Sequence, residues 1–307
     1  MATPGSAEWQ RLITASKVPA ILGVSPYSSP FQVWHEMKSL VVRDDIPTDR
    51  AEFGHLLEPA IKEWWLNRHT TARRPWHCQQ VRNTLRHPSK YSNEHTARGL
   101  ARCNDDVLCP VWGAATLDMQ TRDRDGIMSI VEFKTVMRPD AHAWGSPADG
   151  LAAIPAHILA QVIWQLACTP TAKRAYVAVM RYGLEFAEYR FERAEVENEI
   201  AATIAYCLDF YLSLSSDTPP PLDNSVATLA TLKKLHPDIE QGKEIIFNKA
   251  IDYRKAKSAL KQAELTERGL QNELRDAMGN AQYAVDADGQ RIARRQPNKH
   301  GISLVAL

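Results

Sequence analysis

The sequence predicts an α/β (α+β) fold, because helix and strand patterns follow one another between residues 9 and 214. The chain has 307 residues, of which 44% are hydrophobic and 24% charged, as in ordinary globular proteins. Residues 215–225 are polar and rich in proline, which predicts a linker. We therefore expect a large domain over 1–214, a linker over 215–225 and a C-terminal extension over 226–307.

Helices are predicted in the first part of this domain. Ser29 and Pro30 begin one of them, because serine is a favoured N-cap and proline suits the first helical position. Thr48 or Asp49 is expected to cap a longer helix with one apolar side. Pro59 should kink or interrupt that helix, because proline lacks the N–H that the helical ladder needs.

Strands dominate the middle of the domain, after a polar stretch over 71–110 that predicts an irregular insertion. Two strands over 111–120 and 127–136 flank an Asp125-Gly126 turn, which is typical of a hairpin. The elements that follow are a helix over 155–168, strands over 175–182 and 185–192 with a turn at Gly183, and a helix over 194–212.

The hairpin gathers charged residues on one face. If its turn centres on Asp125, opposed residues have numbers that add to about 250, which pairs Asp118 with Glu132. Strand alternation puts Lys134 on the same face. Two carboxylates this close need a cation, and Mg²⁺ or Mn²⁺ suits hard oxygen ligands. A surface hairpin with a cross-strand ion pair is the commoner explanation of this local pattern taken alone.

Polar residues on neighbouring helices extend the cluster. Glu58, on the longer helix, could supply a third carboxylate. His157, Gln161 and Gln165 recur at i, i+4 and i+8, so they form one stripe on the helix over 155–168. A surface charge and a solvated face are the simpler explanations of Glu58 and of the stripe, and each is commoner when taken alone.

The order of several short motifs resembles the YqaJ-like viral recombinase family. This family includes the phage lambda-type alkaline exonucleases and lies in the PD-(D/E)xK nuclease superfamily. The motifs span roughly residues 9–214 and agree with the predicted elements. They are Ile13-Thr14-Ala15-Ser16-Lys17 with Ile21-Leu22-Gly23; Ser28-Ser29-Pro30-Phe31 and Trp34; Phe53-Gly54-His55 with Leu57-Glu58-Pro59; Ala115-Thr116-Leu117-Asp118; Val131-Glu132-Phe133-Lys134-Thr135; and Pro155-Ala156-His157 with Ala160-Gln161-Val162 and Gln165-Leu166.

The resemblance implies a PD-(D/E)xK nuclease core, with a mixed central β-sheet flanked by helices, over 1–214. A C-terminal helical and hairpin extension would follow it. The implied catalytic residues are Lys134, Glu132, Asp118 and Gln161, and the implied ligands of Mg²⁺ (or Mn²⁺) are Glu58, Asp118, Glu132 and the backbone carbonyl of Phe133.

Contacts to a DNA end are also expected. By the resemblance, Ser16 and Arg11 would hold the 5′-phosphate, and a hydroxyl beside a guanidinium suits that anion. We add His157, from the polar stripe, to the DNA-binding set. Trp144 lies in a loop after the strand that carries Glu132, and we expect it to contact DNA as an aromatic side chain.

The implied function is a Mg²⁺-dependent exonuclease that degrades linear double-stranded DNA from 5′ to 3′ during phage-type recombination. Its implied partners are a single-strand annealing protein and, as in lambda-type enzymes, further copies of itself in a trimeric ring. Its expected location is the cytoplasm of a bacterial host, encoded by a phage or prophage, with no membrane segment. The alternatives are a structure- or sequence-selective endonuclease of repair or restriction, and a catalytically silent DNA-end-binding protein.

The extension and the cysteines add two expectations. Apolar residues step by three and four along 246–277, which indicates either a partner interface or packing within the chain. A hairpin over 282–295 should turn at Asp288-Gly289 and carry a basic end. The five cysteines contain no CxxC pair, so we expect reduced thiols and neither a disulfide framework nor a metal cluster.

Overall fold

The computed structural model describes residues 6–42, 49–69, 79–86, 111–137, 143–181, 185–299 and 301–307, with side chains everywhere except 49–51 and 79–86. It divides into two compact units, Met1–Asp238 and Ile239–Leu307. The division therefore lies later in the chain than the 215–225 linker expected from composition.

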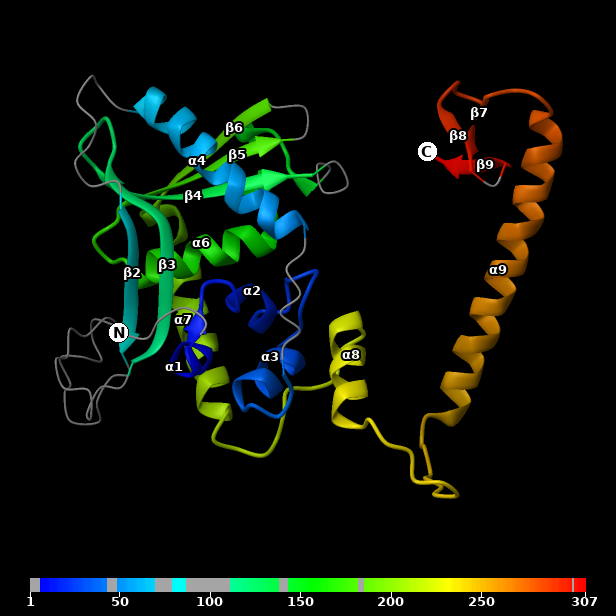
Figure 1. Ribbon diagram of the computed structural model, residues 1–307, viewed down its shortest axis with the longest axis horizontal. Coiled ribbons are helices and arrows are strands. Elements are labelled where there is room, and N and C mark those ends of the chain that lie inside the picture. Colours follow the sequence, from blue (N-terminus) through cyan, green and yellow to red (C-terminus); the bar gives the residue numbers. More distant parts are fainter. Residues whose placement is uncertain are drawn as a thin grey trace. The chain divides into compact units, whose positions relative to one another are not determined.

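The first unit is built on a six-stranded mixed sheet, as expected (Figure 1). Its order is β1-β3-β4-β5-β6, and β2 also pairs with β3. β1 with β3 and β4 with β5 are parallel, while the other pairs are antiparallel. The strands are β1 Ile13–Thr14, β2 Gln79–Arg86, β3 Val111–Arg122, β4 Met128–Val136, β5 Arg174–Arg181 and β6 Glu185–Glu192.

β2 corrects the expectation of an irregular insertion over 71–110. This strand runs antiparallel to β3 from Gln79↔Gln120 to Arg86↔Val111. Its sequence mixes Gln, Arg, Asn and Thr with few apolar residues, so the alternation that identifies a strand is weak. The other residues of that segment, and the turn expected at Gly183, lie outside the described ranges.

α4 (Asp49–His69) covers one face of the sheet over β4 and β5 (Figure 1). Ile61 and Trp65 of α4 are buried in one cluster with Val131 and Phe133 of β4. The helix continues through Pro59, so the interruption considered for that position does not occur.

α6 (Ala156–Cys168) lies on the other side of the sheet, with α2 (Val18–Ile21) and α7 (Glu197–Ser213) packed against it (Figure 1). Its apolar side chains are buried because nearly all its surface is covered by these elements. Trp164 Nε1 donates a hydrogen bond of 3.0 Å to the Ala114 carbonyl, which ties α6 to β3. Strand β4, which carries Glu132 and Lys134, is thus held between α4 and α6.

α8 (Val226–Leu235) belongs to the first unit, which explains the later boundary. Thr228 Oγ1 donates to Ser29 Oγ at 2.8 Å, and both residues are buried. Ser29 also caps α3 (Pro30–Met37) through the Gln32 N–H, as the sequence predicts. The remaining short helices of this unit are α1 Ala7–Gln10, η2 Pro147–Ala153 and η3 Arg193–Val196.

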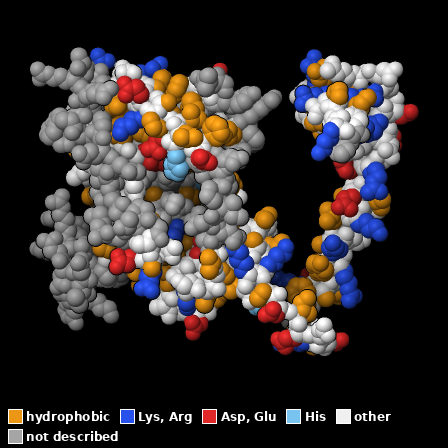
Figure 2. Space-filling view, in the orientation of Figure 1, with side chains coloured by type: hydrophobic (Ala, Val, Ile, Leu, Met, Phe, Trp, Pro, Cys, Tyr) orange, Lys and Arg blue, Asp and Glu red, His pale blue; other side chains and the backbone are white. Residues whose placement is uncertain are grey.

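The second unit contains α9 (Ala250–Met278) and a small antiparallel sheet. The sheet order is β7 (Tyr283–Val285), β8 (Arg291–Asn298) and β9 (Gly301–Ala306), so the expected hairpin gains a third strand. Lys and Arg side chains lie along α9 and around this sheet (Figure 2). Within the described residues, the apolar stripe of α9 is largely exposed, and its role as an interface stays a prediction.

Two expectations about the chain as a whole can be compared with the structure. No single helix within the described ranges meets the length and hydropathy of a membrane span, although the bent pair η2 and α6 does by composition. Cys168 and Cys207 are buried free thiols. Cys78, Cys103 and Cys109 lie outside the described ranges.

Candidate active site

β3 changes partners beside Asp118, so the sheet forks at this position. One edge of β3 pairs with β1 at Gly113 and Ala114 and with β4 only from Met119 onward. The β3–β4 pairs run from Met119↔Val131 to Arg122↔Met128, which is the register that the Asp125-Gly126 turn predicts. Asp118 therefore directly precedes the part of β3 that pairs with β4, and it lies where the two strands separate.

A β-bulge on β3 sets the direction of the Asp118 side chain. Between the pairs Gln79↔Gln120 and Val81↔Leu117, β3 has one residue more than β2. Leu117 and Met119 consequently pack into different hydrophobic clusters, although alternation would put them on one face. The bulge turns Asp118 toward β4, where Oδ2 accepts a 2.9 Å hydrogen bond from the Phe133 N–H.

Glu132 lies next to Asp118 and is almost fully buried, with 2% of its surface exposed. Its Oε1 accepts from Lys134 Nζ and from Gln161 Nε2. Its Oε2 accepts from Gln165 Nε2 at 2.6 Å. A buried carboxylate is tolerated when charged and polar donors surround it in this way.

Gln165 contacts Glu132, although no role in the site is predicted for it from the sequence. It belongs to the predicted stripe of His157 and Gln161, for which a solvated face was the simpler explanation. The structure buries Gln165 against the sheet, and its amide reaches the carboxylate of Glu132. The sequence feature that could have predicted this contact is the position of Gln165, two turns after His157 on a helix that is otherwise apolar.

The charge of Glu132 disfavours ionisation of the neighbouring Asp118. Burial, the neighbouring charge of Glu132 and a smaller effect from Glu58 together raise the pKa of Asp118 to about 8. Lys134 and the Phe133 N–H act in the opposite direction. A divalent cation would relieve this repulsion, so the electrostatics of the site fit a bound metal.

The ligand set fits Mg²⁺ chemically but is not fully assembled. Asp118, Glu132 and the Phe133 carbonyl offer hard oxygen atoms on adjacent strands. Glu58 reaches the site from α4, where its Oε2 lies 3.9 Å from His55 Nδ1. Within the described ranges, no three Asp, Glu, His or Cys side chains converge on one point. Both Glu132 oxygens face nitrogen donors, so metal binding requires a rearrangement of Glu132 or Glu58.

Lys134 completes the cluster as a charged ammonium group. Burial alone would lower its pKa, but the attraction of Glu132, Asp118 and Glu58 raises the pKa above its ordinary value. A permanently charged lysine is suited to stabilise negative charge on a phosphate.

A cleft of about 310 Å³ opens beside this cluster. It brings together most of the DNA-contacting residues that the sequence predicts, because Ser16, Trp144 and His157 line it alongside Lys134 and Gln161. The other lining residues are Pro19, Ser25, Tyr27, Thr135, Val136, Ala143, Pro155 and Ile158.

Arg11 is not among the residues that line this cleft. It lines a separate hollow with Met37, Lys38 and Tyr211. Ser16 Oγ instead lies 3.1 Å from Thr14 Oγ1. Ser16 and Arg11 thus line different hollows, and their joint contact with a 5′-phosphate stays a prediction.

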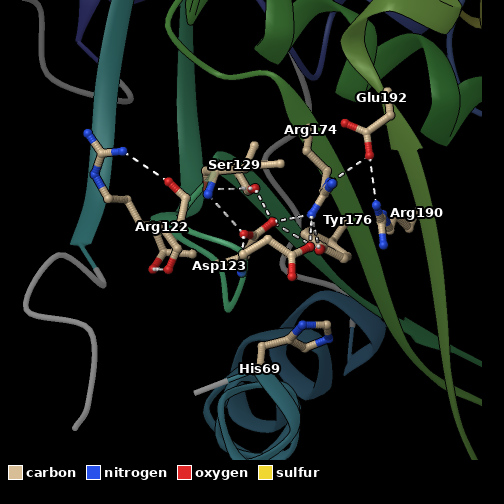
Figure 3. A network of polar contacts seen from close by, with 12 residues as sticks. His69, Arg122, Asp123, Ser129, Arg174, Tyr176, Arg190 and Glu192 are labelled. Carbon is tan, nitrogen blue, oxygen red and sulfur yellow. Dashed lines mark hydrogen bonds and ion pairs between the residues drawn. The ribbon is translucent and has the colours of Figure 1, made fainter. Parts of the chain in front are cut away.

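A second buried polar network lies at the turn end of the hairpin (Figure 3). Arg174 donates to Asp123 at 2.7 Å, to Asp125 at 2.9 Å and to Glu192 at 2.7 Å. Burial raises the pKa of Asp123, but hydrogen bonds, including those from Ser129 and Arg174, bring it below its ordinary value. This network fixes the hairpin to β5 and β6 and has no residue in the cleft.

Comparison with known proteins gives the family. Residues 8–172, more than half of the chain, match the YqaJ-like viral recombinase domain. The chain is 25% identical over 285 residues to "Uncharacterized protein YqaJ" of Bacillus subtilis (strain 168), covering 90% of this chain and 78% of that protein.

Two solved structures of LHK-Exo resemble the fold at low identity. The complex with dAMP shares 13% identity and a TM-score of 0.41. The alkaline exonuclease from Laribacter hongkongensis shares 11% identity and a TM-score of 0.38. Each covers 68% of this chain and 92% of the other. With its match over residues 8–172, the chain belongs to the YqaJ-like viral recombinase domain family.

Proposed function

We propose that this protein is a metal-dependent deoxyribonuclease that degrades linear double-stranded DNA from its ends. The observation that carries the proposal is the pair of Asp118 and Glu132 at the fork of the sheet, with Lys134 charged beside them and a cleft next to it. Family membership supports DNA as the substrate.

Asp118, Glu132 and the Phe133 carbonyl would hold Mg²⁺, or Mn²⁺ in its place, with Glu58 as a further ligand. When bound, the cation supplies Lewis-acid chemistry and an activated water. Gln161 and Gln165 orient the carboxylate of Glu132, because each donates to one of its oxygens.

Lys134 acts on the phosphate of the scissile bond. Its ammonium lines the cleft and carries a positive charge, so it stabilises the negative charge that develops on the phosphate oxygens. Removing one such preorganised donor reduces enzyme rates by roughly 10²–10³-fold.

The same cleft would receive the end of the DNA. Ser16 would contact the 5′-phosphate, and His157 and Trp144 would contact the terminal nucleotide, because all three line the cleft beside Lys134. Cleavage from 5′ to 3′ follows from the family resemblance. A single-strand annealing protein and a ring-shaped homotrimer are the partners we propose, in a bacterial host that carries a phage or prophage.

Digestion of linear duplexes with and without a 5′-phosphate, in Mg²⁺ and in EDTA, tests the proposal. We expect Mg²⁺-dependent release of nucleotides by the wild type and a loss of roughly 10²–10³-fold in Lys134→Ala. Lys255→Ala, which removes an exposed lysine of α9, is the matched control and should keep full activity.

The alternatives predict other outcomes. A structure- or sequence-selective endonuclease would cut closed circular DNA, whereas an end-dependent exonuclease leaves it intact. A silent end-binding protein would retain linear duplex without degrading it. Undiminished activity in Lys134→Ala would overturn the site assignment.

A further inference from the structure

We propose that Tyr27 and Trp144 form a nucleobase subsite, which stacks on the base of the nucleotide removed from the DNA end. Both side chains line the cleft beside Lys134. This inference rests on the proposed nuclease function and assigns the part of the substrate that the cleft holds.

Tyr27 is presented to the cleft by a short structured loop. Its side chain is 66% exposed, and its ring stands edge-to-face with His157 at 5.9 Å between centroids. Ser25 Oγ accepts hydrogen bonds from the N–H groups of Tyr27 and Ser28 at 3.1 and 3.2 Å. These hydrogen bonds fix the backbone of the loop, and the contact with His157 orients the exposed ring, whose flat face is suited to stacking.

Trp144 is held by a contact of its ring and by hydrogen bonds of the next residue, Gly145. Its ring packs on Tyr189 with centroids 5.3 Å apart. The carbonyl of Gly145 accepts from Arg181 at 2.7 Å and from the Tyr189 hydroxyl at 2.8 Å. The Gly145 N–H donates to the Ala153 carbonyl at 2.9 Å, so the backbone after Trp144 is bonded in both directions.

Gly145 itself is required by this arrangement. A Cβ atom at this position would lie 3.0 Å from both the Cα and the Cβ of Ala153. The close approach of the two segments therefore depends on glycine, and it places Trp144 at the wall of the cleft.

The lining of the cleft contains both polar and apolar side chains, as a nucleotide requires. Ser16, Lys134 and Gln161 offer hydrogen bonds and charge for a phosphate, while Tyr27 and Trp144 are joined by apolar side chains. These are Pro19, Val136, Pro155 and Ile158. The volume of about 310 Å³ is at the small end for ligand pockets, which fits one nucleotide and excludes a length of duplex.

Stacking also suits an enzyme that removes nucleotides from a DNA end regardless of sequence. An enzyme that degrades DNA from an end must accept every base in turn, so hydrogen bonds to base edges would be a disadvantage. Every base has a flat face, and stacking on aromatic side chains is tolerant of sequence. Two aromatic residues in the cleft are therefore appropriate for this substrate.

The first test compares duplexes whose 5′-terminal, phosphorylated nucleotide either carries its base or lacks it. We expect the wild type to release the intact nucleotide roughly five- to 150-fold faster at low substrate concentration. Tyr27→Ala should lose most of this preference, while Tyr27→Phe should keep it because the aromatic face remains. Tyr206→Ala, which removes a similarly exposed tyrosine of α7, is the matched control and should keep the wild-type preference.

The second test measures binding without catalysis. Titration with a deoxynucleoside 5′-monophosphate and with 2-deoxyribose 5-phosphate should show tighter binding of the former, and Tyr27→Ala should reduce the difference. Equal binding of the two ligands, or an unchanged difference in Tyr27→Ala, would overturn the subsite. Base-dependent binding by a protein that degrades no DNA would retain the subsite and overturn the nuclease proposal.

Discussion

Replacing Arg174 with methionine should destabilise the first unit strongly. Arg174 is 4% exposed and donates to the carboxylates of Asp123, Asp125 and Glu192 (Figure 3). Methionine keeps a long flexible side chain but removes the charge, so the main effect is electrostatic.

The size of the loss in unfolding free energy follows from the burial of the three carboxylates that Arg174 contacts. The Asp125 and Glu192 side chains are 60% and 35% exposed, so the loss of either ion pair costs about 0–1 kcal/mol. The Asp123 side chain is only 1% exposed, and a buried charge left without its partner costs about 3–5 kcal/mol. We therefore expect a loss of about 3–5 kcal/mol, dominated by Asp123.

Thermal unfolding followed by circular dichroism measures this loss. For a unit of this size, about 2–4 °C of Tm per kcal/mol gives a decrease of roughly 6–20 °C. Asp125→Asn, which removes only the exposed ion pair, should change Tm by no more than about 2–4 °C. Adding Asp123→Asn to Arg174→Met should recover part of the loss, because the uncompensated charge is gone. A decrease in Arg174→Met no larger than in Asp125→Asn would refute the reasoning.

Further predictions concern the site and the buried titratable groups. Gln165→Leu should reduce Mg²⁺-dependent nuclease activity by roughly 10–100-fold, measured by titration with Mg²⁺, because Glu132 loses a donor that orients it; an unchanged Mg²⁺ dependence would contradict this role. The folded pKa of Asp123 is lowered, so its contribution to stability is present above the unfolded pKa of about 3.9 and is lost as the pH falls toward the folded value. The difference in unfolding free energy between wild type and Asp123→Asn should accordingly shrink as the pH falls from roughly 6 to roughly 3, a range that brackets the unfolded pKa. A difference that stays constant over this range would contradict the predicted contribution of Asp123. Burial raises the pKa of Cys207 to about 12 and raises that of Cys168, so iodoacetamide should label both in urea and neither in the native protein, as peptide mass spectrometry would show; native labelling would contradict their burial.

The register of the hairpin formed by β3 and β4 could be predicted because it depends on local information. Asp125-Gly126 is a turn sequence, and Gly126 has a φ of 78°, which glycine adopts readily. The turn sets which residues of β3 and β4 are opposed, and the observed pairs agree with the prediction. The bulge was not predictable, because it appears only in the pairing of β3 with the distant strand β2.

The two residues predicted to bind the 5′-phosphate show a different limit. Ser16 and Arg11 are close in the sequence, yet only Ser16 lines the cleft. Only the two-residue strand β1 and its flanking residues lie between them. Spacing along the chain therefore says little about proximity here.

The sequence alone determined the mixed α/β class, the order of the main elements and the grouping of Glu132 with Lys134, because helix and strand periodicity and turn chemistry act over a few residues. Tertiary structure decided where those groups meet their partners. It buried Gln165 on Glu132, turned Asp118 into the fork and brought Tyr27 and Trp144 into the lining of one cleft. Each of these depends on contacts between segments far apart in the chain, whose geometry local periodicity does not encode.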